Sequence, residues 1–262
     1  MEKTLAPMKD LGSSDRFAYE WSHYDTIIPE YEQQFLKWVS PLTKDFFQDK
    51  TILDAGCGIG RNSYWPLCYG AASVDAFDYA APTVAVARRN LARFANANVF
   101  QESIYNLDEK NTYDLAFSIG VIHHLERPHD AVRRLYEAAK PDGKVLIWVY
   151  GYEGNEWIVR YVNPVRAITS RLPVMFVHML AALLTMPLYL FVRLLPQKHP
   201  YFKQLDSFKF WHIQSIIFDQ LLPRIVNYWT RDQALELFHS LPVKEIQALR
   251  VNNNSWTIIA KK

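Results

Sequence analysis

Between residues 51 and 150, short apolar runs alternate with longer segments rich in polar residues, and this pattern predicts strands and helices in turn. The apolar runs are 51–53, 74–78, 99–101, 113–118 and 144–150. Two of the intervening segments, 83–94 and 130–140, predict helices. Strands that alternate with helices form parallel sheets through right-handed crossovers. The sequence therefore predicts an α/β fold with a mostly parallel sheet over this part of the chain.

The pattern changes after Gly151, where a long insertion begins. Leu172–Val192 contains no formally charged residue, and it is long enough to suggest a membrane span. Pro187 predicts that this stretch forms two short helices rather than one. Three roles stay open for residues 172–195: an apolar lid or core, a homodimer contact, and a segment lying in the membrane interface.

The remaining pattern divides the chain into three parts. Residues 1–49 predict a tail, an aromatic cluster and a flanking helix, and residues 152–227 form the helical insertion. The core takes residues 50–151 and 228–262. In its second piece, Thr230–Gln233 matches a capping box, and the runs 243–248 and 255–260 predict two more strands.

Composition narrows the function further. The chain has 262 residues, half of them apolar, and a formal net charge of +2 without a long basic run. We therefore expect no nucleic-acid partner. The two cysteines, Cys57 and Cys68, do not form a C-x-x-C pair, so neither a metal site nor a disulfide framework is expected. Residues 1–16 lack the apolar core of a signal peptide, so we expect a cytoplasmic protein, with peripheral membrane contact as the open alternative.

The candidate chemistry begins at Thr51–Arg61, which reads TILDAGCGIGR. Three glycines at alternate positions let the backbone turn tightly after a strand and lie close against a ligand. A dinucleotide site needs the spacing G-x-G-x-x-G, and here Arg61 occupies the place of its last glycine. This spacing disfavours a nicotinamide or flavin cofactor.

The string Leu53–Gly60 resembles the first motif of class I S-adenosylmethionine (SAM) dependent methyltransferases, and the closest general resemblance is to their small-molecule type. The resemblance covers roughly residues 50–150, plus the closing helix and the two last strands. It implies a Rossmann-like sheet of seven strands, mostly parallel, with helices on both faces and an antiparallel closing hairpin. It also implies SAM as the cofactor, S-adenosylhomocysteine (SAH) as the product, and methyl transfer as the reaction.

The resemblance also implies a set of cofactor contacts. Asp78 ends the second strand about twenty residues after the glycines, where a carboxylate accepts hydrogen bonds from ribose hydroxyls. Arg61 is placed to reach the methionine carboxylate. Ser103 departs from the family, which often has an acid there, so either its hydroxyl or Glu102 is the expected adenine contact. The full predicted set is Asp54, Gly56, Cys57, Gly58, Arg61, Asp78, Tyr79, Glu102, Ser103, Ile104, Ser118, Ile119 and Gly120.

Catalysis needs little beyond alignment, because the sulfonium already carries an activated methyl group. Where the acceptor is a hydroxyl or ammonium, a base must take its proton. His123, just past the fourth strand, is the first candidate, and the alternative is that it only packs against the cofactor loop. The other candidates for this base are Tyr24, Tyr150, Glu153, His212 and Asp219.

The acceptor is expected to be a small molecule, apolar or lipid-like, because the insertion on the ligand edge of the sheet is apolar and aromatic. Three alternatives stay open: a partner protein that binds SAM without catalysis, a nucleic-acid or protein methyltransferase, and a nucleotide-dependent oxidoreductase.

Overall fold

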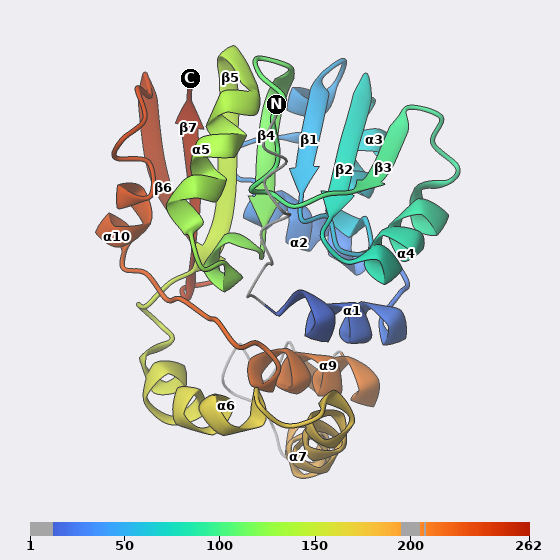
Figure 1. The fold of residues 1–262 in the computed structure, drawn as a ribbon. Helices are drawn as coiled ribbons and strands as arrows, with labels where there is room; N and C mark the ends of the chain where they lie inside the picture. Colours follow the sequence, from blue (N-terminus) through green and yellow to red (C-terminus); the bar gives the residue numbers. More distant parts are fainter. Residues whose placement is uncertain (1–12, 195–204, 207) are drawn as a thin grey trace, which may run out of the picture.

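A seven-stranded sheet forms the core of the computed structural model, which describes residues 13–194, 205–206 and 208–262. The strand order is β3-β2-β1-β4-β5-β7-β6 (Figure 1). The strands are β1 (Thr51–Ala55), β2 (Ser73–Asp78), β3 (Ala97–Gln101), β4 (Tyr113–Ile119), β5 (Ala139–Tyr150), β6 (Glu245–Val251) and β7 (Ser255–Lys261). The predicted α/β fold, with its seven strands and closing hairpin, is confirmed.

The first five strands run parallel, and β7 is antiparallel to both of its neighbours, β5 and β6. The order reverses between β1 and β4, because β2 and β3 lie on one side of this pair and β5 on the other. Open α/β sheets bind ligands outside the carboxyl ends of their strands at such a point. The fold therefore places a ligand crevice where β1 and β4 end.

Helices cover both faces of the sheet, as predicted. On one face lie α2 (Glu30–Trp38), α3 (Arg61–Cys68), α4 (Ala81–Leu91) and the 3₁₀ helix η1 (Lys44–Phe47). On the other lie α5 (Pro128–Ala138) and α10 (Arg231–Glu236) (Figure 1). Neighbouring residues of β1 divide between them, because Ile52 packs into the first layer and Leu53 into the second.

A third layer lies beyond the carboxyl ends of the strands (Figure 1). It contains the leading helix α1 (Ser14–His23), the π-helix η3 (Ile158–Val162), α6 (Asn163–Thr169), α7 (Val174–Leu194) and α9 (Phe210–Leu221). A short 3₁₀ turn, η2 (Ile122–His124), follows β4 at the same edge. The predicted tail falls largely on residues 1–12, outside the described part.

Two expected boundaries were wrong. Pro187 lies inside the single helix α7 rather than between two helices. A proline removes one backbone hydrogen bond, but α7 packs against α9 on both sides of it, through Ala181 before and Val192 after. β5 begins at Ala139 rather than Lys144, because the residues before Lys144 form a bulge in the ladder with β4.

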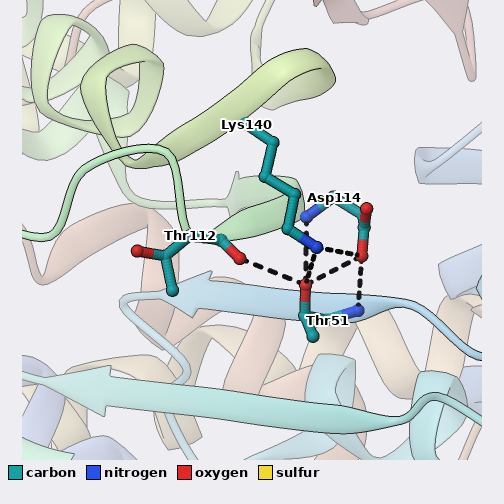
Figure 2. A network of polar contacts seen from close by, with 4 residues as sticks. All are labelled: Thr51, Thr112, Asp114 and Lys140. Atoms are coloured by element: carbon teal, nitrogen blue, oxygen red, sulfur yellow. Dashed lines mark hydrogen bonds and ion pairs between the residues drawn. The ribbon is translucent and has the colours of Figure 1, made fainter.

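At the opposite end of the sheet, a polar network joins β1, β4 and β5 (Figure 2). The backbone N–H and hydroxyl of Thr51 both donate to the carboxylate of Asp114, each over 2.8 Å. Lys140 Nζ lies 3.0 Å from the same carboxylate oxygen and 3.0 Å from the Thr51 hydroxyl. The network fastens the amino ends of three strands, at the end of β1 opposite to the glycine turn.

We predict that Asp114→Asn lowers the free energy of unfolding by about 1–2 kcal/mol at pH 7. Burial alone would raise the pKa of Asp114, but hydrogen bonds from Thr51 and Lys140 together hold it below its usual value. The contribution is therefore present at neutral pH and lost as pH falls through the folded-state pKa. Denaturant unfolding at pH 7 and pH 3 measures it.

The control is Asp142→Asn, which removes an exposed carboxylate paired with Lys244 and Lys261. Such exposed pairs contribute little, so this variant should unfold like the parent protein. Equal losses in both variants, or a loss in Asp114→Asn that persists at pH 3, would contradict the role given to the network.

Candidate active site

The glycine turn after β1 is held directly against the end of β2. The backbone N–H groups of Gly56 and Cys57 both donate to the carbonyl of Phe77, each over 2.8 Å. Gly56 has φ +80°, and a Cβ built there would lie 2.4 Å from a methyl of Val121. Only glycine meets both conditions. The turn therefore packs tightly between the end of β2 and the loop after β4.

Asp78 closes β2 beside this turn. One carboxylate oxygen accepts from Gly58 N over 3.1 Å, and the other accepts from Ala80 N over 3.1 Å. Asp75, the other acid of the strand, accepts instead from the Tyr113 hydroxyl over 2.8 Å and from the Asn98 amide. Asp78 thus faces the crevice, whereas Asp75 has a structural role. Tyr79, next in the chain, is partly exposed at the same edge.

Asp54 lies within β1 and is completely buried. The Ser63 hydroxyl donates to one of its carboxylate oxygens over 2.6 Å, while the other has no hydrogen-bond partner among the described residues. Burial raises the pKa of Asp54 to about 7, with a further contribution from Asp78, against the opposing effect of Ser63. Cys57, also buried, contributes its backbone to the turn rather than a reactive thiolate, because burial raises the pKa of its thiol.

The residues predicted around the adenine lie along the same edge. Glu102 accepts from Ser103 N over 2.8 Å, and the buried Ser103 hydroxyl accepts from Tyr105 N. The Ser118 hydroxyl donates to the carbonyl of Ala55 over 2.8 Å, which ties the end of β4 to that of β1. Ile104 and Ile119 are buried.

Gly120, which directly follows β4, has open space beside its backbone. It has φ +81°, and a Cβ built there would meet no atom within 4 Å. The backbone at this position therefore faces free space, in contrast to the crowded Gly56.

His123 and Tyr150 are brought together. Their rings stack with centroids 3.9 Å apart, and the Tyr150 hydroxyl donates to Asp219 on α9 over 3.2 Å. His123 is fully buried, and neither ring nitrogen has a hydrogen-bond partner among the described residues. Burial, helped by His124 and Arg166, holds the pKa of His123 well below its usual value. The ring is therefore neutral at pH 7.

Tyr24 is not part of that pair. It packs with the insertion and stacks on Trp211 with ring centroids 6.1 Å apart. Burial raises the pKa of Tyr24 to about 12, so its hydroxyl stays protonated. Among the described residues, no group of three or more His, Cys, Asp or Glu side chains is arranged to hold a metal ion.

A family model described as a methyltransferase domain matches residues 52–143, from β1 to the start of β5. The matched segment includes the glycine turn, Asp78 and His123. The chain carries a class I SAM-dependent methyltransferase domain. SAM is accordingly the cofactor of this domain.

Known proteins extend this likeness in sequence and in structure. The chain is 30% identical over 166 residues to phosphoethanolamine N-methyltransferase 2 of Caenorhabditis elegans, which covers 57% of this chain and 38% of that protein. It is 28% identical over 140 residues to a tRNA U34 carboxymethyltransferase of Photobacterium profundum, covering 52% and 39%. The chain therefore spans about two fifths of the length of these relatives.

The fold resembles that of magnesium protoporphyrin IX methyltransferase from Synechocystis, solved with bound SAH. The TM-score is 0.56 at 14% sequence identity, over 95% of this chain and 93% of that one. At this identity the likeness shows a shared fold and no more.

The residues of the methyltransferase domain fit SAM in three respects. The glycine turn and Gly120 offer backbone without side chains in the way. Asp78 presents a carboxylate at the end of β2. Asp54 and His123 keep buried polar atoms without protein partners, and such atoms are rare unless a ligand or water completes them.

Arg61 lies at the start of α3 in an aromatic cage. Its guanidinium lies 5.3 Å from the ring centroids of Trp21, Tyr31 and Trp38 alike. The Trp21 indole also lies 3.7 Å from where a Cβ of Gly58 would be, so α1 covers the turn of the methyltransferase domain. The structure thus places Arg61 between the glycine turn and α1.

Two buried charged residues beside the site, Arg166 and Glu20, were not identified from the sequence. Arg166, on α6, is buried and donates to the Gln220 carbonyl over 2.6 Å and to the Tyr228 hydroxyl over 3.1 Å. Glu20, on α1, is fully buried, and burial raises its pKa well above the usual value, with Asp219 adding to the effect. No local pattern marks either residue, because each is buried only where α1, α6 and α9 meet the sheet.

Other acid–base candidates have different surroundings. Glu153 accepts from the Trp256 indole over 3.3 Å and from Arg231 N over 3.2 Å. His212 stacks on Phe208 with ring centroids 4.1 Å apart. Both contacts are structural, so His123 and Tyr150 remain the pair that the structure assembles at the edge of β4 and β5.

We predict that Asp54→Asn stabilises the cofactor-free protein at high pH. The folded carboxyl binds its proton more tightly than the unfolded one, whose pKa is near 3.8. The free energy of unfolding therefore falls as pH rises from about 4 to about 7, by up to about 4 kcal/mol in the parent protein. Asparagine keeps an acceptor for Ser63 and carries no charge. Denaturant unfolding at pH 4, 6 and 8 measures the difference between the two proteins.

The advantage of the variant should grow with pH, which is opposite in sign to the behaviour of Asp114→Asn. An advantage that is flat between pH 4 and 8, or greatest at pH 4, would show that the Asp54 carboxyl titrates normally.

Proposed function

We propose that this protein transfers the sulfonium methyl group of SAM to a small acceptor that is apolar or lipid-like. The observation that supports the acceptor class is the position of the insertion. Its helix α9 reaches the crevice through the hydrogen bond between Asp219 and Tyr150. The same helix contributes Phe218 and Leu221 to an apolar cluster with α7. The insertion that would cover an acceptor near Tyr150 is therefore built around an apolar cluster.

In this proposal the turn at Gly56, Cys57 and Gly58 lies along SAM, and the Asp78 carboxylate accepts hydrogen bonds from the ribose. Glu102, Ser103 and Ile104 surround the adenine, with Tyr79 beside it. Arg61 reaches the methionine carboxylate from the start of α3. Asp54, Ser118, Ile119 and Gly120 complete the wall below the sulfonium.

SAM, when bound, supplies a methyl group that is already activated for transfer. The protein contributes alignment of the acceptor with that methyl, which accounts for much of the acceleration in reactions of this type. α1 and α9 exclude water from the edge of the sheet. This favours transfer to an anion, because the reaction destroys charge.

His123 is the proposed base. Its ring is neutral at pH 7, and neither ring nitrogen has a partner among the described residues, so one nitrogen is available to accept a proton from an acceptor hydroxyl or ammonium. Tyr150 fixes the plane of the ring by stacking, and Asp219 fixes Tyr150. Tyr24 lies farther out, at the end of α1 where it packs against the insertion, and is proposed to contact the acceptor rather than the transferred proton.

An RNA acceptor is the second candidate, since several relatives are named as tRNA U34 carboxymethyltransferases. The net charge of +2 and the lack of a long basic run weigh against it.

We propose that the protein lies in the cytoplasm, with its insertion facing a membrane or a second copy of the chain.

We predict that Asp78→Ala weakens binding of SAH by about 10- to 100-fold, because two hydrogen bonds to a charged group are lost. Titration calorimetry with SAH measures this affinity. The matched control is Asp75→Asn on the same strand, which should bind SAH as the parent does. Unchanged affinity in Asp78→Ala, or equal losses in both variants, would mean that Asp78 does not hold the ribose.

We predict that radiolabelled SAM delivers its methyl group to an organic-soluble acceptor in a panel of quinols, phenols, phospholipids and tRNA. In His123→Ala the turnover number should fall by about 100-fold, while SAH affinity and KM change little. His124→Asn serves as the neighbouring control.

Tight SAH binding without transfer to any acceptor would favour a non-catalytic partner protein, and transfer to tRNA alone would favour the second candidate. An unaltered rate in His123→Ala would mean that His123 has only a packing role and is not the base.

A further inference from the structure

The insertion exposes many large apolar side chains to solvent. Seven that are more than 60% exposed are Tyr161, Ile168, Met175, Phe176, Met179, Leu183 and Leu194. They lie on η3, α6 and α7, and α7 lies on the far side of α9 from the sheet (Figure 1). We call these seven residues the apolar face. Exposed apolar patches of this kind mark interaction surfaces.

The sequence around this face is one-sided in charge. No Asp or Glu occurs between Glu156 and Asp206, although the chain contains 27 acidic residues in all. The same stretch contains six basic residues, namely Arg160, Arg166, Arg171, Arg193, Lys198 and Lys203. All the formally charged residues of the segment that carries the apolar face are therefore basic. Cationic, apolar and aromatic residues together are typical of helices that lie on anionic membranes.

A surface hollow of about 830 Å³ opens where α7 begins. Its lining includes Arg16, Arg171 and Arg224 and a single acid, Asp15, so its formal charge is +2. Burial, together with the nearby Arg224, lowers the pKa of Arg16, as expected where positive charges crowd. Val174, the first residue of α7, also lines the hollow and adds the positive end of the helix dipole.

We propose that the apolar face docks on an anionic phospholipid bilayer, with α7 lying along the surface and a headgroup phosphate in the hollow. This proposal deepens the proposed function, because it brings the active site to the phase that holds a lipid-like acceptor. It also identifies the partner of residues 172–195 as a membrane.

α7 is long and apolar enough to cross a membrane by length and composition, and it is the only such helix among the described residues. Its contacts favour an in-plane position. Val177 and Val192, which lie near the two ends of α7, both pack toward α9. The His178 ring lies 3.1 Å from the Tyr19 hydroxyl on α1, and Arg193 pairs with Asp206 over 3.1 Å. Crossing the bilayer would remove these contacts.

A second copy of the chain is the other occupant to weigh. In a two-fold dimer the same patch would meet itself. The cationic surroundings of the apolar face would then repel each other, and like charges across an interface oppose association. An anionic lipid surface is complementary to the same charges.

The test is co-sedimentation of the whole protein, without SAM, with vesicles of phosphatidylcholine alone or of phosphatidylcholine mixed with phosphatidylglycerol. We expect binding at least about tenfold tighter to the mixed vesicles, weakening as salt is added. The double variant Phe176→Asp/Leu183→Asp should lose binding to both kinds of vesicle. Arg160→Glu/Arg171→Glu should lose the preference for phosphatidylglycerol.

The matched control is Ile246→Asp, an exposed apolar residue on the edge strand β6. It should bind vesicles as the parent does. Titration calorimetry with SAH on the same variants separates the two proposals. Normal SAH affinity without vesicle binding would overturn only the membrane proposal, and vesicle binding without SAH affinity would overturn only the proposed function.

Three results would overturn the membrane proposal. The first is equal binding of the parent and the double variant. The second is a dimer in sedimentation equilibrium that the double variant abolishes, with no vesicle binding by the parent. The third is membrane association released by detergent but not by alkaline carbonate, which would show that α7 spans the bilayer.

Discussion

The site depends on the contact between the turn after β1 and the end of β2. Two backbone N–H groups of the turn, from Gly56 and Cys57, share one acceptor, the carbonyl of Phe77. This pairing requires the backbone to fold back immediately after the strand, which the positive φ of Gly56 allows. It also places the carboxylate of Asp78 within a hydrogen bond of Gly58. The turn and Asp78 therefore form one corner at the edge of the sheet, where the nucleoside is proposed to bind.

The structure keeps polar groups beside this corner that a purely structural core would not retain. Within the part of the chain that the structure describes, one oxygen of the buried Asp54 and both ring nitrogens of the buried His123 have no hydrogen-bond partner. Unsatisfied groups of this kind cost about 1–3 kcal/mol each. Apolar residues of similar size would avoid that cost, so these groups are better explained by function than by stability. They lie where the methyltransferase domain is expected to place the sulfonium and the acceptor.

The sequence predicted the parts of the site that depend on local order. Strand ends and glycine spacing place the turn and Asp78, because the carboxyl ends of parallel strands meet at one edge. The cage around Arg61 and the burial of Arg166 were not predicted, since they arise where α1 and α6 pack against residues far away in the chain. Pro187 was misinterpreted for the same reason: local propensity favours a break, and packing against α9 outweighs it. The roles of the individual site residues stay predictions.

The central claim is that the corner formed by the turn and Asp78 holds the nucleoside of SAM. A crystal structure of the protein with SAH tests it most directly. The account predicts the ribose hydroxyls within hydrogen-bond distance of the Asp78 carboxylate, the adenine beside Glu102 and Ser103, and the sulfur facing His123. SAH bound elsewhere, or at the turn with its ribose turned away from Asp78, would contradict it.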